Sequence, residues 1–398
     1  MKLNGSDIIA EVLIEQGVDT IFGYPGGAVL NIYDALYKYR DKIHHILTAH
    51  EQGASHAADG YARATGKTGV VIATSGPGAT NLVTGIATAY MDSIPMVAIT
   101  GNVGTSYIGK DAFQEVYITG ITMPITKHNF FVSDIKELAP TLREAFKIAN
   151  SGRKGPVLVD IPKDVTAAIT EYEKAAPEVI IDNTVINEDE VKKAAALINK
   201  AKRPVIEIGG GVVSSEASDL VRMLVNKTGA PCCHTLMAAG VLGYSERLNY
   251  GLVGMHGSFV TNKAIDEADV LVAIGTRFSD RVALNTNRFA HKAKVIQIDI
   301  DLSEIDKNVK VDHALVGDVK TIVMDLLHYV KQSDRTDWLK TLDEYKNSDY
   351  HPVDSDKFIT PHQLIRAICE NVPKDTVYVT DVGQHQMWAA QYYPFKEP

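Results

Sequence analysis

The sequence predicts an α/β protein with consecutive domains, each a mostly parallel sheet with helices on both faces. Apolar runs such as 70–74 and 96–100 alternate with stretches in which apolar residues recur at helical spacing. The runs are apolar throughout, as is typical of parallel strands buried on both faces. Small or glycine-rich turns follow several of them, and ligands of such sheets bind beyond the carboxyl ends of the strands.

Length and composition narrow the class of protein. A chain of 398 residues with 45% hydrophobic residues is long enough for two or three domains with buried cores. The net charge of -9, without a run of Lys or Arg, argues against a nucleic-acid partner. Neither a signal-peptide core nor an apolar run near the ~20 residues of a membrane span occurs, so we expect a soluble cytoplasmic protein with no membrane partner. Cys232, Cys233 and the distant Cys369 form no disulfide framework or CxxC metal site, which suggests a reducing compartment.

Glu51 is the leading candidate for chemistry in the first part of the chain. It follows a predicted strand at 43–47 and begins a predicted helix with alanines at helical spacing. Gly53 and Gly60 lie in that helix although each costs roughly 1 kcal/mol there, which suggests that another backbone approaches closely. On this stretch alone, a glutamate favoured by the helix dipole is the better interpretation.

Two glycine-rich turns, 24–27 and 75–81, follow predicted strands in the same region. The segment Gly76–Gly78 lacks the Lys-Ser/Thr pair of a P-loop and the third glycine of the dinucleotide fingerprint, so alone it is a weak phosphate signal. Together with 50–53 and 111–115, the two turns form an ordered set that is far more specific than any one of them.

With that set, the chain resembles the catalytic subunits of acetolactate synthase (acetohydroxyacid synthase), thiamine-diphosphate enzymes of the pyruvate oxidase and decarboxylase group. Further matching stretches are 151–157, 160–165, 254–257 and 381–388, so the resemblance runs from near Gly5 to the last residues. It implies a pyrimidine-binding domain at 1–168, a linker at 169–184, a central FAD-binding domain of Rossmann-like fold at 185–340, a linker at 341–356, and the start of a truncated diphosphate-binding domain at 357–398.

The resemblance also implies an activity. Two pyruvates would condense to 2-acetolactate and CO₂, or pyruvate and 2-oxobutyrate to 2-aceto-2-hydroxybutyrate, in branched-chain amino-acid biosynthesis. Glu51 would be the catalytic glutamate, whose carboxyl drives the cofactor aminopyrimidine to its imino form. The run of alanines around it would keep this carboxyl partly desolvated. The implied thiamine diphosphate residues are Tyr24, Pro25, Gly26, Gly27, Glu51, Ser75, Pro77, Gly78, Asn81, Gln114, Gly383, Gln384 and His385.

The family's pyrimidine pocket is completed by a second subunit, so a homodimer with the active site between subunits is implied, and a small regulatory subunit is possible. The 2-keto acid substrates would meet Phe113, Gln114, Lys163 and Arg281. A solvated loop lysine is a nearly equal interpretation of Lys163. Ser279 and the pair Ala283-Leu284 depart from the pattern usual around the arginine.

The middle of the chain has its own strand pattern. Predicted strands at 204–208, 268–274 and 294–300 end in small or acidic residues, although Gly209–Gly211 lacks the full dinucleotide fingerprint. FAD in this family accompanies a reaction with no net redox step, so its presence would not indicate an oxidase. The FAD residues implied by the resemblance are Arg153, Gly209, Gly210, Gly211, Thr235, Leu236, Met237, Met255, His256, Gly257, Gly275, Arg277, Asp299, Ile300, Gly317 and Asp318.

The last segment has a predicted strand at 377–380, but no Gly-Asp-Gly with a following Asn occurs anywhere. We therefore expect the ligands of the Mg²⁺ that accompanies thiamine diphosphate to be absent from this chain, and the chain alone to be inactive. The alternatives are another FAD-containing enzyme of the group, such as pyruvate oxidase or glyoxylate carboligase, and a non-catalytic FAD-binding scaffold. Glu51 disfavours the carboligase, which lacks that glutamate, and the register of Gln114, Lys163, Met255 and Arg281 disfavours pyruvate oxidase.

Overall fold

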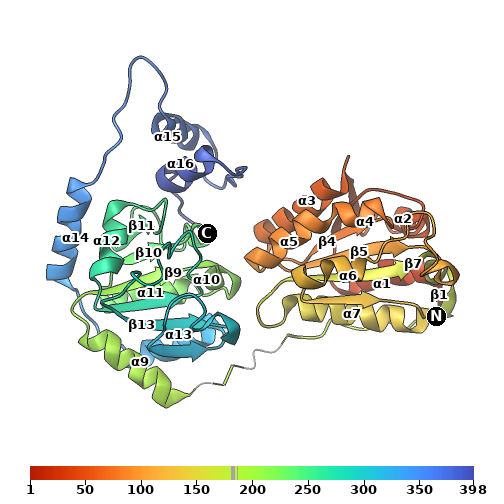
Figure 1. Cartoon of the computed structure of the whole chain (residues 1–398), viewed down its shortest axis with the longest axis horizontal. Coiled ribbons are helices and arrows are strands. Elements are labelled where there is room, and N and C mark those ends of the chain that lie inside the picture. The colour runs from red at the N-terminus through yellow and green to blue at the C-terminus, as the bar shows by residue number, and fades with distance from the viewer. Residues whose placement is uncertain (181–183, 186) are drawn as a thin grey trace. The chain divides into compact units, whose positions relative to one another are not determined.

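The computed structural model describes residues 1–180, 184–185 and 187–398. The chain forms two compact units, Met1–Ile181 and Asp182–Pro398. Each unit contains a six-stranded parallel sheet with helices on both faces (Figure 1), which confirms the predicted fold class. None of the helices in the described part of the chain is long and apolar enough to cross a membrane.

The sheet of unit 1 contains the strands expected at 43–47, 70–74 and 96–100, together with further strands. In spatial order its strands are β3 (His44–Leu47), β2 (Thr20–Gly23), β4 (Gly69–Ala73), β5 (Met96–Asn102), β7 (Pro156–Pro162) and β6 (His128–Phe131). All neighbouring pairs are parallel, so their carboxyl ends share one edge. A separate antiparallel pair joins β1 (Lys2–Asn4) to β8 (Ile169–Glu171).

Alternation along the strands assigns the helices of unit 1 to two faces (Figure 1). One face packs against α1 (Gly5–Glu15), α2 (Leu30–Lys38) and α7 (Ile135–Asn150). The other packs against α3 (Glu51–Thr65) and α5 (Val83–Asp92). The short helices are α4 (Pro77–Asn81), α6 (Ile118–Thr122), α8 (Lys163–Ala167), η1 (Thr105–Tyr107) and η2 (Met123–Ile125).

Helix α3 is held close to its neighbours, although by other glycines than the sequence suggested. Gly53 and Gly60 are exposed, and a Cβ on either would meet nothing within 4 Å in this chain. The close approaches are at Gly69, where a Cβ would lie 2.2 Å from the Ala58 carbonyl oxygen, and at Gly85, where it would lie 2.1 Å from Ser55 Oγ. The second turn of α3 is thus fixed against β4 and α5.

Unit 2 repeats the architecture with a different strand order. Its sheet runs β11 (Asn249–Leu252), β10 (Cys232–His234), β9 (Pro204–Ile208), β12 (Val270–Ile274), β13 (Lys294–Asp299) and β14 (His313–Val316). One face packs against α9 (Glu188–Lys200), α11 (Ser218–Thr228) and α13 (Val319–Tyr329), and the other against α12 (Phe259–Glu267) and α14 (Thr336–Ser348). The short helices are α10 (Gly210–Ser214), η3 (Leu236–Ala238) and η4 (Leu302–Glu304).

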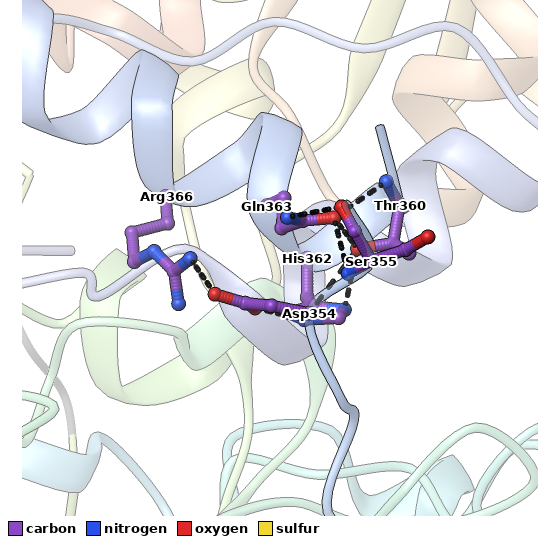
Figure 2. A network of polar contacts seen from close by, with 6 residues as sticks. All are labelled: Asp354, Ser355, Thr360, His362, Gln363 and Arg366. Atoms are coloured by element: carbon purple, nitrogen blue, oxygen red, sulfur yellow. Dashed lines mark hydrogen bonds and ion pairs between the residues drawn. The ribbon is translucent and has the colours of Figure 1, made fainter. Parts of the chain in front are cut away.

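The segment after α14 leads into α15 (Pro361–Asn371) and α16 (Gln384–Tyr392). Figure 2 shows the polar network at the start of α15: Asp354 accepts from His362 Nε2 at 2.8 Å and from Arg366 at 2.6 Å, and Gln363 Oε1 accepts from the Thr360 backbone at 3.0 Å. The prediction of a strand at 377–380 is wrong, because these residues form no strand in the structure. A strand needs a paired neighbour, and these residues have none among the described sheets.

The predicted domain boundaries remain predictions. The linker expected at 169–184 contains β8, and its residues 181–183 lie outside the described part. Helix α14 runs from before to after the boundary expected at residue 340, with Trp338 and Leu342 buried in the core next to α12.

Candidate functional site

Glu51 is the first residue of α3, which begins after the short turn 48–50 that follows β3, at the carboxyl edge of the unit 1 sheet. The carboxyl is buried, with the residue only 8% exposed, and its Oε2 accepts from Asn81 Nδ2 at 2.9 Å. Its Oε1 has no hydrogen-bond partner among the described residues. A Cβ on Gly78 would lie 3.2 Å from that oxygen, so the glycine leaves space beside it. One oxygen of a buried carboxyl is therefore fixed, and the other is available to a donor.

Thr74 joins the two glycine-rich turns of this site. It follows β4, and its Oγ1 accepts from the Ala28 backbone N–H at 3.1 Å. A Cβ on Gly26 would lie 2.4 Å from Thr74 Cβ, and one on Gly78 would lie 2.7 Å from Thr74 Cγ2. Glycine is therefore required at both positions by packing. This role of Thr74 was not predictable from the sequence, because Thr74 ends an apolar run and resembles any β-branched strand residue.

Gln114 reaches the same place from the loop after β5. It has a left-handed backbone (φ 59°), and a Cβ on Gly76 would lie 2.9 Å from its Cα. Glu115 closes this loop by accepting from the Ala112 backbone at 2.9 Å and from the Gly109 backbone. The structure thus brings together Glu51, the turns 24–27 and 75–81, and Gln114. Phe113, in contrast, is 86% exposed.

Tyr33 is a neighbour of Glu51 that the sequence analysis did not identify. Its hydroxyl lies 3.2 Å from His45 Nε2, and a Cβ on Gly23 would lie 2.7 Å from it. Burial, and then the charge of Glu51, raise the pKa of the Tyr33 phenol well above its usual value. Tyr33 therefore stays a neutral hydroxyl beside the carboxyl. In the sequence, Tyr33 lies on a predicted amphipathic helix and cannot be distinguished there from an ordinary core tyrosine.

Lys163 begins α8 directly after β7, with an exposed side chain. Its carbonyl oxygen accepts from Thr166 Oγ1 at 2.6 Å. The next residue, Asp164, accepts from the backbone N–H of Thr105 at 2.9 Å and from its hydroxyl at 2.5 Å. These bonds tie the loop that carries Gln114 to the turn that carries Lys163.

Asp160 lies inside the sheet below these loops. It accepts from Thr100 Oγ1 at 2.7 Å and from Asn102 Nδ2 at 2.6 Å, and it is only 2% exposed. Burial raises the pKa of Asp160 to about 6, although the two hydrogen bonds oppose that shift. The ends of β5 and β7 are thus joined by a buried side-chain network as well as by the strand ladder.

In unit 2 the residues that the resemblance implied for FAD lie at the carboxyl ends of the strands. The turn after β9 packs backbone to backbone on the turn after β12: a Cβ on Gly209 would lie 2.3 Å from the Gly275 carbonyl oxygen, and one on Gly211 would lie 2.6 Å from Gly275 Cα. Small residues thus form a cradle at the middle of the sheet edge. The other residues that the resemblance implied for FAD, all at this edge of the sheet, are Gly210, Thr235, Leu236, Met237, Met255, His256, Gly257, Arg277, Asp299, Ile300, Gly317 and Asp318.

Arg281 adjoins that edge through its backbone. Its carbonyl oxygen accepts from the Met255 N–H at 2.8 Å, whereas its guanidinium is exposed and pairs with Asp280 at 3.2 Å. The carbonyl oxygen of His256 accepts from Gln391 of α16 at 2.7 Å. The 254–257 turn therefore contacts both Arg281 and the C-terminal helix.

Four residues predicted to bind a cofactor do not lie in the same unit as the other residues predicted for that cofactor. Arg153 belongs to unit 1, where its Nε donates to Ser93 Oγ at 2.8 Å. Gly383, Gln384 and His385 belong to unit 2, at the start of α16. Across residues 1–180, 184–185 and 187–398, no three His, Cys, Asp or Glu side chains gather into a group that could hold a metal ion.

Two family profiles match the chain. Residues 3–121 match the N-terminal TPP binding domain of thiamine pyrophosphate enzymes, and residues 191–326 match their central domain. The first match contains Glu51, Asn81 and Gln114, and the second contains the glycine cradle of unit 2. Fold and matches together define a chain with the first two domains of a thiamine pyrophosphate enzyme.

Comparison with individual proteins shows which family of thiamine pyrophosphate enzymes the chain resembles. The chain is 48% identical to an acetolactate synthase of Mycobacterium leprae, over 100% of this chain and 65% of the relative. It is 47% identical to a probable acetolactate synthase large subunit of Methanocaldococcus jannaschii, covering 69% of that protein, and 44% identical to the large subunit of Lactococcus lactis, also covering 69%. The chain belongs to the acetolactate synthase large-subunit family. It spans about two thirds of the length of these relatives.

Proposed function

We propose that the protein condenses two 2-keto acids, with pyruvate as the first, to 2-acetolactate or 2-aceto-2-hydroxybutyrate and CO₂. The observation that carries this proposal is the buried Glu51 carboxyl, with Oε2 held by Asn81 and Oε1 facing the space beside Gly78. When bound, thiamine diphosphate supplies a carbon nucleophile after it loses a proton. The geometry suits Glu51 as the group that exchanges a proton with the aminopyrimidine at Oε1.

The other residues of the site have supporting tasks. Asn81 holds one oxygen of the carboxyl, and Gly26 and Gly78 let the two turns pack closely on Thr74. Gln114, seated on Gly76, limits access of water from the side of the β5 loop. Lys163 and Arg281 are proposed to attract the substrate carboxylates, the arginine by two-pronged pairing.

The first experiment is acetolactate formation from pyruvate, with thiamine diphosphate, Mg²⁺ and FAD supplied, by this chain and by any longer natural chain that contains it. We expect Glu51→Gln to lower kcat by roughly a hundredfold or more, because general acid–base groups contribute about that much. Glu144→Gln is the matched control, since Glu144 is an exposed glutamate of α7 whose side chain is 46% exposed. Unchanged kcat in Glu51→Gln would exclude the proposed role.

Product analysis separates the alternatives. Acetyl phosphate with peroxide would indicate a pyruvate oxidase, condensation of glyoxylate a carboligase, and bound flavin without turnover a scaffold. The inactivity expected of residues 1–398 alone stays a prediction. It is tested by the same assay, because product from this chain would show that its own residues suffice for the diphosphate and its metal.

We further propose that unit 2 binds FAD. The close packing of Gly209 and Gly211 on Gly275 supports this, because residues without side chains let a pyrophosphate approach the backbone at the ends of the central strands. The N–H groups of Gly209 and Gly211 themselves donate to the carbonyl oxygens of Ile274 and Gly275. Arg277 lies beside this cradle as a cation for the phosphate charge. Flavin absorbance after desalting tests the proposal, and its loss in Gly211→Val is expected.

We propose a homodimer in the cytoplasm as the functional state. Unit 1 exposes several large apolar side chains, which a partner would cover: Tyr90, Met91, Tyr107, Phe113, Tyr117 and Met123. Gly53 and Gly60 leave the outer face of α3 open to a second backbone. Sedimentation analysis with Gly60→Arg as the disrupting variant tests this. Relatives named large subunits suggest a small partner subunit as well.

A further inference from the structure

A buried polar cluster lies directly beneath the glycine cradle of unit 2. Glu207 of β9, Gln297 of β13 and Thr276, two residues beyond β12, are at most 3% exposed. Thr276 Oγ1 donates to Glu207 Oε1 at 2.9 Å, and Gln297 Nε2 donates to the Thr276 carbonyl oxygen at 3.2 Å. Both ends of Thr276 are therefore held by residues of the sheet.

This cluster is in contact with the cradle. A Cβ on Gly209 would lie 2.8 Å from both the Cα and the Cβ of Thr276. Any shift of Thr276 would therefore change how the turn after β12 meets the turn after β9. The cluster braces the position of the proposed FAD pyrophosphate without touching the cofactor itself.

Two acceptor atoms in the cluster lack a donor. Glu207 Oε2 and Gln297 Oε1 are buried, and neither has a hydrogen-bond partner among the described residues. The strand register places Glu207 beside Ala273, and Ala273 beside Gln297. Laterally paired residues of a parallel sheet point to the same face, so the two long side chains flank the small alanine. A protonated Glu207 carries a hydroxyl that can donate across this gap, whereas an ionised Glu207 adds a further unpaired acceptor.

The surroundings favour the neutral carboxyl. In the described part of the chain no cation pairs with Glu207. On its other side β10 presents Cys233, whose pKa burial raises well above its usual value, so it stays a thiol. The hydroxyl of Tyr250 on β11 is engaged with Arg247 and Asp343. The helices on this face contribute apolar side chains. Burial raises the pKa of Glu207 to about 7, opposed by the bond from Thr276.

We propose that Glu207 is a protonation-dependent positioning residue for the flavin: while its carboxyl is neutral, the cluster holds the Gly275–Arg277 turn against Gly209–Gly211. Ionisation strengthens the single bond from Thr276 but leaves a buried charge without a cation beside the unpaired Gln297 oxygen, and this charge loosens the packing beneath the cradle and weakens flavin binding. The inference rests on the proposed FAD site. It predicts that the chain retains flavin better just below neutral pH than above it.

The test measures the Kd of FAD by flavin fluorescence from pH 6 to pH 8.5 in the full chain. If only the protonated form binds well, a midpoint near 7 gives a Kd about thirtyfold higher at pH 8.5 than at pH 6. Glu207→Gln keeps the shape and cannot ionise, so its Kd should vary little over this range. Glu216→Gln, an exposed glutamate of the same unit, should behave like the unchanged protein.

Each outcome has a distinct meaning. Flavin binding in Glu207→Gln with the unchanged pH dependence would overturn the inference and leave the FAD site intact. Absence of flavin from every variant at every pH would overturn both. If Glu207→Gln does not fold, as judged by the fluorescence of the buried Trp338, Glu207→Met offers a second uncharged side chain of similar length and must give the same flat profile.

Discussion

Removing one donor from the buried Asp160 carboxyl should destabilise unit 1 in a pH-dependent way. Thr100→Val keeps the shape of the side chain but removes the hydroxyl that donates to Asp160 Oδ1 at 2.7 Å. Thr100 is 0% exposed and Asp160 2%, so water does not readily replace that donor. We expect a loss of about 2 kcal/mol in the free energy of unfolding at pH 8, where Asp160 is ionised. At pH 5, where it is mostly protonated, the loss should be about 1 kcal/mol.

The sign follows from the pKa of Asp160, which burial raises from 3.8 to about 6. The stability that this carboxyl contributes is fully present below pH 3.8 and is lost as the pH rises through 6, in all about 3 kcal/mol. Thr100→Val removes a hydrogen bond that favours the ionised form. The substitution therefore raises the pKa of Asp160 in the folded state further, and it lowers the free energy of unfolding most above pH 6.

Urea unfolding followed by circular dichroism at pH 5 and pH 8 measures the effect. Both tryptophans, Trp338 and Trp388, lie in unit 2, so the tryptophan transition is an internal reference that should not move. Thr88→Val is the matched control, because Thr88 is only half-buried and its hydroxyl donates to the carbonyl one turn earlier in α5, in a bond that is exposed to water. Equal losses at both pH values, or a shifted tryptophan transition, would refute the reasoning.

Three further predictions concern single side chains. Asp318→Ala removes the N-cap of α13 and should cost about 1 kcal/mol in tryptophan-monitored urea unfolding, with the circular dichroism of unit 1 unchanged. Arg143→Met leaves Glu15 buried without its cation and should cost about 3 kcal/mol at pH 7. Burial would raise the pKa of Glu15, but the hydrogen bonds that it accepts, with that from Arg143 the strongest, hold this pKa below its usual value. The loss of stability in Arg143→Met should therefore shrink as the pH falls below 4.5, because Glu15 then becomes protonated. Gly26→Ala should lower the melting temperature without any cofactor, whereas Gly27→Ala should not, and equal shifts would contradict the assigned packing.

The central strands of both sheets, and the edge at which their turns meet, were predictable because they depend only on where apolar runs occur in the sequence. Runs such as 70–74 and 204–208 are apolar at nearly every position, so they had to be central strands with both faces covered. Their carboxyl ends then had to carry the turns that meet at one sheet edge. The place of Glu51 at such an edge followed from its position after 43–47 and before a helix, whereas its burial did not follow from that position.

Shorter elements and lateral contacts escaped prediction for physical reasons. The strand Cys232–His234 has three residues, too few to show a period, and its stability comes from the neighbours on both sides. The run 377–380 has strand-like composition, but no strand of the described part of the chain pairs with it, so its composition alone predicted the wrong structure. The bonds from Thr100 to Asp160 and from Thr276 to Glu207 join residues more than fifty positions apart, which no local pattern encodes.

The same packing arrangement occurs at the carboxyl edge of both sheets. Thr74 in unit 1 and Thr276 in unit 2 each follow a central strand and press a β-branched side chain against glycines of the adjacent turn: Gly26 and Gly78 in one case, Gly209 in the other. Each hydroxyl is engaged, with the Ala28 backbone or with Glu207, so neither side chain is free to rotate away. These glycines are therefore required by the protein's own packing before any cofactor is considered. A Cβ on Gly27, in contrast, would meet nothing within 4 Å in this chain, so a requirement for glycine there would have to come from a bound ligand or a partner subunit.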